Sequence, residues 1–417
     1  MAHDAAPDYR QLPTLVDSQS QPLTAAEPEV LGRPRNRAID ALRGIVMVLM
    51  VLDHARDFYF GPMRVRATDL TVTTPLLFYT RFVTHFCAPV FVFLAGTSAF
   101  LYGARTSRSE LSRFLVARGA LLVLLELTVV RLCWIPDPFY RFTLLQVIWA
   151  LGWSMILLAA LVHLPGSVSL AVGVLIVAGH NLLDAFHARD FGALGWVWSL
   201  LLERGSWEPL PGHRVVISYP ILPWFGVMVL GHAFGAIVRL KAAQRRARTL
   251  RLGLLACCAF AVLRAWNTYG DPVPWSLQPT AAFSVMSFLN CEKYPPSLCY
   301  LLMTLGPALC LLSLLESQRV QVKAYRGLVV RFATLGGVPL FFYIAHLVLL
   351  RYTSAPLAVV RFGASAFSPP PGHAGSPEFD LWVAYLAWIV ALLALYPLAA
   401  WFRRKKEQRP NSWLRYS

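Results

Sequence analysis

The sequence is dominated by apolar runs that are long enough to cross a lipid bilayer. One crossing needs about 20 mostly apolar residues. About ten such runs can be placed, near residues 38–58, 76–102, 112–132, 142–163, 166–183, 217–238, 250–266, 296–316, 332–351 and 380–402. The fifth run is short, and residues 191–202 could form a further re-entrant or interfacial piece. The sequence therefore predicts an all-α, polytopic integral membrane bundle of about ten transmembrane helices.

The composition excludes other classes of protein. Hydrophobic residues make up 57% of the chain and charged residues 14%, whereas a soluble domain has about 25% charged residues. A soluble enzyme could not bury so much apolar surface, and a disordered chain would not contain it. The net charge of +16 resides in short clusters between the apolar runs, a pattern typical of loops that face anionic lipid. We therefore expect the lipid bilayer as a partner and no nucleic acid.

Three regions can be distinguished along the chain. Residues 1–36 are rich in Pro, Gln, Ser, Ala and acidic groups and lack an apolar run, which predicts a disordered cytoplasmic tail. Residues 37–403 contain the apolar runs and form the predicted transmembrane domain, and residues 404–417 form a basic cytoplasmic tail. Lys and Arg are concentrated in both tails and in alternate loops, so the positive-inside rule places both termini in the cytoplasm.

The first apolar run carries four ionisable residues, Asp40, Arg43, Asp53 and His54. Charges inside a membrane are costly and often mark a functional site. The spacing of Arg43 and His54 places them on one helix face, with a rise of roughly 16 Å between them. Arg43 could hold a phosphate group through bidentate contacts. His54 could act as a base near the outer surface, oriented by Asp53 or another carboxylate.

A structural explanation of the same residues stays open. An ion pair between Asp40 and Arg43 would account for both, with His54 at the level of the lipid headgroups. Adjacent helix positions point about 100° apart, so Asp53 could serve a partner other than that of His54.

A second group of ionisable residues lies near the outer surface. Arg81 and His85 are spaced i, i+4 in the second run and share one helix face. Arg81 could instead extend to the interface, with His85 packed in the core. His180 and His346 also map to the outer halves of their runs. Together with His54 they form a cluster that indicates function more strongly than any single histidine does.

The loop between the seventh and eighth runs, FLNCEKYPPSL, contains Glu292, Lys293 and Tyr294. It could rim an external substrate groove or form a rigid turn before a helix. His232 lies in the inner half of the sixth run. The sequence has no zinc motif, no phosphate-binding Gly-rich loop and no nucleophile elbow, and we expect no metal.

Four blocks of the sequence resemble one family. The block RNRAIDALRGIVMVLMVLDHARDFYF is similar to the opening signature of the bacterial relatives of heparan-α-glucosaminide N-acetyltransferase. The blocks YPILPWFGVMVLGHAFG, FLNCEKYPPSLCYLLMTLGPAL and GGVPLFFYIAHLVL resemble the same family. The spacing of Arg43 and His54 is also similar to that in membrane O-acetyltransferases of surface polysaccharides.

The resemblance implies an integral membrane acyltransferase. Such an enzyme would move an acetyl or acyl group from cytoplasmic acetyl-CoA or another acyl-CoA to a sugar hydroxyl or amine on the extracytoplasmic side, here across a bacterial inner membrane. Arg43 would contact the acyl-CoA, and His54 would be the base or acyl-relay residue. The family's proposed catalytic histidine lies between the first two spans, where residues 61–75 contain none. That role would pass to His54 or His85.

The candidate residues fall into three groups by expected role. The catalytic candidates are His54, Asp53 and His85; those for acyl-CoA binding are Arg43, Asp40 and His232; those for binding the acceptor are Arg81, His346, Glu292, Lys293 and Tyr294.

Two other functions remain open from the sequence. The chain could be a transporter or flippase of a sugar or lipid-linked intermediate, or a membrane scaffold without catalytic activity. No internal repeat of the kind found in many transporters is visible, which favours acyl transfer. The sequence also leaves a homodimer open.

Overall fold

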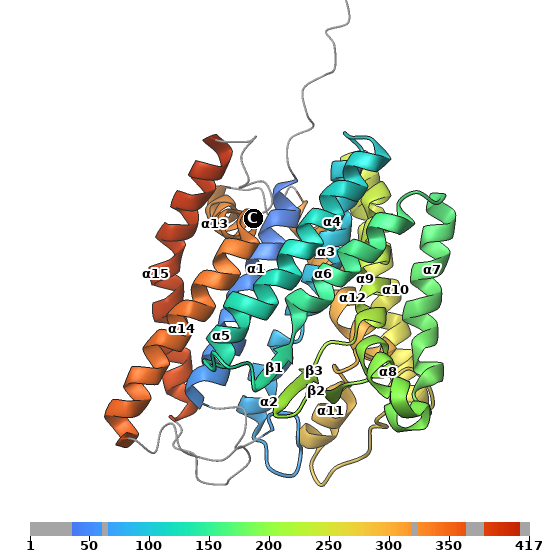
Figure 1. The fold of residues 1–417 in the computed structure, drawn as a ribbon. Helices are drawn as coiled ribbons and strands as arrows, with labels where there is room; N and C mark the ends of the chain where they lie inside the picture. Colours follow the sequence, from blue (N-terminus) through green and yellow to red (C-terminus); the bar gives the residue numbers. More distant parts are fainter. Residues whose placement is uncertain (1–35, 61–65, 318–322, 364–378, 409–417) are drawn as a thin grey trace, which may run out of the picture. The chain divides into compact units, whose positions relative to one another are not determined.

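The structure is a computed structural model that describes residues 36–60, 66–317, 323–363 and 379–408. It consists of helices that run largely side by side, with a small three-stranded sheet at one end (Figure 1). The predicted tail over residues 1–36 lies almost entirely outside the described residues. The predicted tail after residue 403 begins inside the last helix, which extends to Gln408.

The helical elements follow one another with short connections. They are α1 (Arg37–Ala55), the π-turn η1 (Arg56–Phe60), α2 (Pro75–Thr84), α3 (Cys87–Gly103), α4 (Arg108–Leu125), the π-turn η2 (Glu126–Val130), α5 (Arg131–Trp134), α6 (Val147–Leu161), α7 (Gly166–Gly179), the 3₁₀ turns η3 (His180–Leu183) and η4 (Ala188–Leu194), α8 (Gly195–Leu201), α9 (Ile221–Val238), α10 (Ala242–Trp266), α11 (Ala281–Leu289), α12 (Leu298–Leu315), α13 (Lys323–Gly336), α14 (Pro339–Phe362) and α15 (Leu381–Gln408).

Among the described residues, seven helical segments are long and apolar enough to cross a membrane. They are Pro75–Gly103, Gly166–Leu183, Ile221–Val238, Ala242–Trp266, Leu298–Leu315, Pro339–Phe362 and Leu381–Gln408. The prediction of a helical protein with several membrane-spanning segments is confirmed. The remaining three predicted runs fall mainly on α1, on α4 with η2, and on α6. The first of these is interrupted by charges, and α6 has 15 residues.

Two predicted segment boundaries are wrong. The run at 332–351 is divided, because α13 ends at Gly336 and α14 begins at Pro339. Proline favours the first turn of a helix and disfavours its interior, so this break has a local cause. The run at 142–163 begins with a strand, β1 (Phe142–Leu145), before α6.

The sheet is formed by segments far apart in the chain. Strand β3 (His213–Ile217) lies between β1, to which it is parallel, and β2 (Gly205–Leu210), to which it is antiparallel. The predicted re-entrant or interfacial piece at 191–202 forms part of η4 and helix α8, which precede β2. The sheet thus joins the chain after α5 to the chain before α9.

Glycines allow two helix pairs to approach closely. A Cβ at Gly44 of α1 would lie 1.9 Å from the Phe332 carbonyl oxygen of α13, and one at Gly336 would lie 1.9 Å from the Asp40 carbonyl oxygen. A Cβ at Gly231 of α9 would similarly lie 1.9 Å from the Phe93 carbonyl oxygen of α3. Small residues at helix contacts let backbones pack closely where no hydrophobic force drives association in lipid. These contacts fix α13 against α1 and α9 against α3.

Helix α15 runs antiparallel to α1. The Phe379 backbone N–H donates to the Tyr59 carbonyl at 3.2 Å, and the Trp388 indole N–H donates to the Val48 carbonyl at 2.9 Å. Near the other end, Arg403 donates to the Ala333 carbonyl of α13 at 2.7 Å. The start of α1 and the end of α15 therefore lie at the same end of the bundle (Figure 1).

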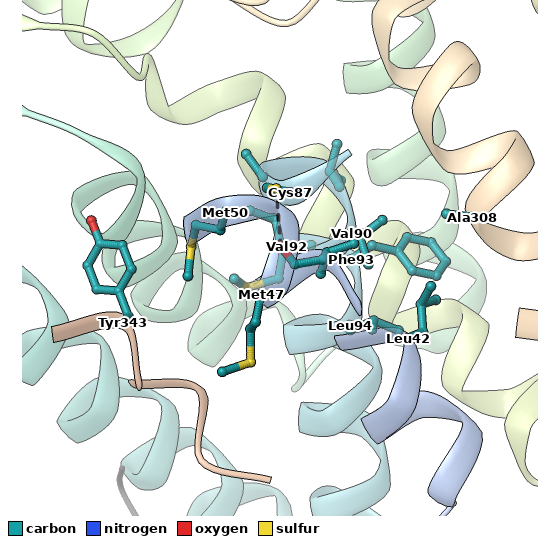
Figure 2. Close-up of a cluster of buried hydrophobic side chains, with 14 of the residues drawn as sticks. Leu42, Met47, Met50, Cys87, Val90, Val92, Phe93, Leu94, Ala308 and Tyr343 are labelled. Carbon is teal, nitrogen blue, oxygen red and sulfur yellow. Dashed lines mark hydrogen bonds between the residues drawn. The ribbon is translucent and has the colours of Figure 1, made fainter. Parts of the chain in front are cut away.

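The face of α1 between Arg43 and His54 is packed into the core. Met47 is 0% exposed and Met50 is 7% exposed. Figure 2 shows both methionines among apolar side chains of α3, with the Tyr343 ring to one side. The two ends of α1 are thus separated by packed side chains, and the flexible ones among them are methionines.

Candidate functional site

His54, at the C-terminal end of α1, is hydrogen-bonded to His346 of α14. His54 Nδ1 and His346 Nε2 are 2.6 Å apart, the ring centroids are 4.9 Å apart, and the ring planes differ by 8°. Stacked rings cannot bring two nitrogens so close, so the imidazoles lie edge to edge in nearly one plane. This alignment suits an N–H···N hydrogen bond.

The hydrogen bond behind His346 determines which nitrogen donates. His346 Nδ1 is 2.8 Å from the Phe342 carbonyl oxygen, which can only accept, so Nδ1 carries the hydrogen. In a neutral imidazole Nε2 is then an acceptor, and His54 Nδ1 donates to it. The network assigns this tautomer, and it leaves a lone pair on His54 Nε2. His54 is therefore arranged as a base.

Two aromatic side chains flank the histidine pair. The ring of Trp134, from α5, meets the His54 ring edge-on at 5.2 Å, and the ring of Tyr343, from α14, lies 6.1 Å from it. His346 is 0% exposed, whereas His54 is partly exposed. Of the two histidines, His54 is the one that a ligand can reach. His346, which the sequence suggested for acceptor binding, lies behind it.

Asp53 faces a different part of the bundle from His54. Arg81 NH1 lies 2.7 Å from both Asp53 carboxylate oxygens. Arg56 NH2 lies 3.0 Å from Asp53 Oδ1, and the Thr84 hydroxyl donates to it at 2.8 Å. The expectation that a carboxylate orients His54 is wrong, because His346 occupies the Nδ1 position. The alternative, that Asp53 has a partner of its own, is confirmed.

A cavity of about 140 Å³ lies beside Arg81. Its lining residues are Thr68, Arg81, His85, Val273, Asn290, Cys291, Glu292, Lys293 and Tyr294. His85 is 3% exposed, and its Nδ1 has no hydrogen-bond partner within the described residues. The structure thus brings Arg81 and His85 together with the loop before α12, as expected for the rim of a binding site. We call this the outer cavity.

Tyr294 lies among positive charges at the outer cavity. Arg81 NH2 donates to the Tyr294 hydroxyl at 3.2 Å, and Lys293 Nζ lies 5.0 Å from the centroid of its ring. Burial alone would raise the pKa of Tyr294, but Lys293 and Arg81 lower it to about 8. Glu292 is fixed by backbone N–H groups of Lys293 and Tyr294, and burial raises its pKa.

Arg43 lies at the other end of α1, near α13. It forms an ion pair with Asp40 at 3.1 Å and donates to the Gly336 carbonyl at 3.2 Å and the Ser98 hydroxyl at 2.9 Å. The ion pair foreseen by the structural explanation is therefore present. His232 of α9 meets the ring of Phe100 on α3 at 5.3 Å.

Arg118 was missed as a candidate because it was counted among the loop cations. It lies within α4, close enough to Arg43 for their charges to repel. Its buried Nε has no hydrogen-bond partner in the described part of the chain. Two neighbouring guanidinium groups can together stabilise a phosphate. Its position inside the apolar run at 112–132 was the signal that could have revealed it.

The predicted residues thus form three groups rather than one continuous stripe. His54 pairs with His346 on one side of α1, Asp53 joins Arg81 and the outer cavity on another side, and Arg43 lies at the opposite end. His180 contacts only backbone, with its ring nitrogens 3.0 Å and 2.9 Å from the carbonyl oxygens of Ile176 and Pro296. No group of three or more His, Cys, Asp or Glu that could hold a metal is present among the described residues.

Residues 35–265 match the family described as heparan-alpha-glucosaminide N-acetyltransferase, catalytic. The match covers more than half of the 417 residues. It includes His54, Arg43 and Arg81, and it ends before the loop at 292–294 and before His346. A search of curated proteins finds no match.

Proposed function

Because the chain belongs to the heparan-alpha-glucosaminide N-acetyltransferase family, we propose that it moves an acetyl or acyl group from cytoplasmic acyl-CoA to a sugar hydroxyl or amine outside the cytoplasm. The family match and the apolar helices make it an integral membrane transferase. The donor, the acceptor and the sidedness are the proposed part. Ten crossings with both termini in the cytoplasm would agree with the antiparallel course of α1 and α15.

The hydrogen-bonded pair His54–His346 carries the proposal. His54 Nε2 takes the proton from the acceptor hydroxyl or amine as that group attacks the acyl carbon. The imidazolium so formed keeps its Nδ1–H on His346, and a charge-assisted hydrogen bond is stronger than a neutral one. His346, fixed by the Phe342 carbonyl, therefore positions His54 and stabilises its protonated form.

The inner end of α1 is suited to the nucleotide portion of the donor. Arg43 and Arg118 lie close together, and an anion between them would relieve their repulsion. The rise of roughly 16 Å from Arg43 to His54 would be spanned by an extended donor that displaces methionine side chains. The outer cavity, with Arg81, Lys293 and Tyr294, would receive the acceptor.

The activity test uses purified protein in proteoliposomes, with radiolabelled acetyl-CoA and glucosamine as the acceptor probe. We expect labelled sugar with the wild type and none with His54→Ala, while His163→Ala, which changes a histidine outside the three groups, stays active. A transporter would instead move the sugar across the bilayer without acetyl-CoA. Full activity in a well-folded His54→Ala protein would contradict the mechanism.

Binding of the donor can be measured without knowing the acceptor. A ligand that binds only the folded protein raises its melting temperature by mass action. We expect acetyl-CoA to raise the melting temperature of the wild type and of His54→Ala, but much less that of Arg43→Ala or Arg118→Ala. No shift in the wild type at millimolar acetyl-CoA would favour transport or a scaffold.

A further inference from the structure

Two buried hydrogen-bond donors beside His54 have no partner. The Trp134 indole Nε1 and the Tyr343 hydroxyl are both shielded from solvent and make no hydrogen bond within the described residues. Leaving a buried donor unpaired is costly, and each such group needs an explanation. Both lie on residues whose rings contact the His54 ring.

The two donors converge from different elements. Trp134 is the last residue of α5, and Tyr343 precedes His346 by three positions on α14, so it shares a helix face with that histidine. The indole N–H lies beside the Tyr343 hydroxyl, yet the two are not aligned to satisfy each other. The packing holds the donors in place without a native acceptor.

The nearest recorded carboxyl group does not serve as that acceptor. Glu126, in η2, lies close enough to Tyr343 to influence it electrostatically. Its Oε2 accepts the backbone N–H of Trp149 at the start of α6, at 3.1 Å, and its Oε1 has no partner. The hydrogens of Trp134 and Tyr343 therefore remain available for a ligand atom.

We propose that the Tyr343 hydroxyl and the Trp134 indole N–H form the oxyanion site of the transferase, binding the carbonyl oxygen of the acyl thioester next to His54. This rests on the proposed function. It assigns two catalytic residues that the sequence did not suggest. Fixed donors aimed at developing negative charge are among the strongest contributions to acyl transfer.

The step at this site balances as follows. The acceptor oxygen or nitrogen forms a bond to the acyl carbon, and its proton goes to His54 Nε2. The carbonyl π electrons move to the oxygen, which the hydroxyl of Tyr343 and the N–H of Trp134 stabilise. When the carbonyl reforms, the C–S bond breaks, its electron pair leaves on sulfur, and the thiolate takes the proton from His54.

The test removes one hydrogen-bond donor at a time and keeps the aromatic ring. Tyr343→Phe and Trp134→Phe are compared with Trp153→Phe, because Trp153 also carries a buried indole N–H without a partner but has no recorded ring contact with His54. Activity is measured as release of labelled acetate from acetyl-CoA with water as acceptor, and as transfer to glucosamine. Melting temperatures with and without acetyl-CoA report folding and donor binding.

We expect each of the two site variants to lower kcat by about 10²–10³-fold, with little change in KM for acetyl-CoA or in its thermal shift. Trp153→Phe keeps the wild-type kcat. If the wild type and Trp153→Phe are active, His54→Ala is inactive, and both site variants keep kcat within about 3-fold, the oxyanion site is wrong while the base mechanism stands. Absence of transfer by the wild type overturns both proposals.

Loss of folding is separated from loss of chemistry by the same measurements. A site variant that melts earlier but has wild-type kcat when folded shows that its donor is structural, and this contradicts the proposal. If Tyr343→Phe does not fold, Trp134→Phe decides the outcome, because each donor is predicted to affect kcat independently.

Discussion

Arg81 binds both carboxylate oxygens of Asp53, at 2.7 Å each, and so directs Asp53 away from its sequence neighbour His54. Arg56 adds a second ion pair at 3.0 Å. Asp53 is therefore the common anion of two guanidinium groups that link α1, η1 and α2. Its role in this arrangement is to hold the outer end of α1 in place.

The first prediction concerns the stability of this ion-pair cluster. Asp53→Asn leaves two buried guanidinium groups without their anion, and breaking a buried pair costs roughly 3–5 kcal/mol. We expect a large fall in the melting temperature of the detergent-purified protein. Glu407→Gln, which breaks an exposed ion pair with Arg403, should change it little, since such pairs contribute about 0–1 kcal/mol. An Asp53→Asn protein with wild-type stability but no activity would instead make Asp53 catalytic.

The second prediction concerns the partner of His54. His346→Phe removes the acceptor for His54 Nδ1, so the tautomer and the imidazolium lose their support. We expect transfer from acetyl-CoA to fall by about 10²–10⁴-fold, the range for general base catalysis. His346→Gln, whose amide oxygen can accept the same hydrogen bond, should retain more activity than His346→Phe. Equal activities of the two variants would argue against a positioning role for His346.

The third prediction concerns pH and Tyr294. Its pKa in the folded protein is about 8, below the ordinary value of about 10. A depressed pKa adds stability that is complete above the unfolded value and is lost as pH falls through the folded value. The melting temperature of the wild type should therefore include a contribution that rises between about pH 8 and pH 10. Tyr294→Phe should lack that rise, whereas Tyr352→Phe, at an exposed tyrosine, should keep it.

Helical segments and their ionisable residues could be predicted because length and hydropathy are local properties. The apolar run that holds α9 needs no knowledge of its neighbours. The break between α13 and α14 was also local in origin, at Gly336 and Pro339, but an apolar stretch of adequate length concealed it. The ion pair of Asp40 with Arg43 followed from a spacing of three residues.

The pairing of His54 with His346 could not be predicted in the same way. The two residues are 292 positions apart, and nothing in either segment indicates which helices become neighbours. The sequence placed both in the outer half of the membrane, which is the limit of a topology argument. Trp134 and Tyr343 gave no signal at all, because an aromatic residue in an apolar run is usually a packing residue.

The fourth prediction concerns the contact of α1 with α13 that positions Arg43. Gly44→Ala would place a Cβ 1.9 Å from the Phe332 carbonyl oxygen, and a backbone atom cannot move aside as a side chain can. The helices must separate, at a cost of roughly 1–3 kcal/mol or more. The separation would also lengthen the bond from Arg43 to the Gly336 carbonyl. We expect a lower melting temperature and a smaller thermal shift with acetyl-CoA.

Gly327→Ala provides the matched control for that prediction. Gly327 lies on the same helix, α13, but a Cβ there would meet nothing within 4 Å. Alanine is favoured over glycine in a helix by about 1 kcal/mol, so this variant should melt at or slightly above the wild-type temperature and keep its thermal shift. Because both changes add one methyl group to an interhelical glycine pair of elements, only the close approach at Gly44 distinguishes them. Equal behaviour of the two variants would mean that the contact does not position Arg43.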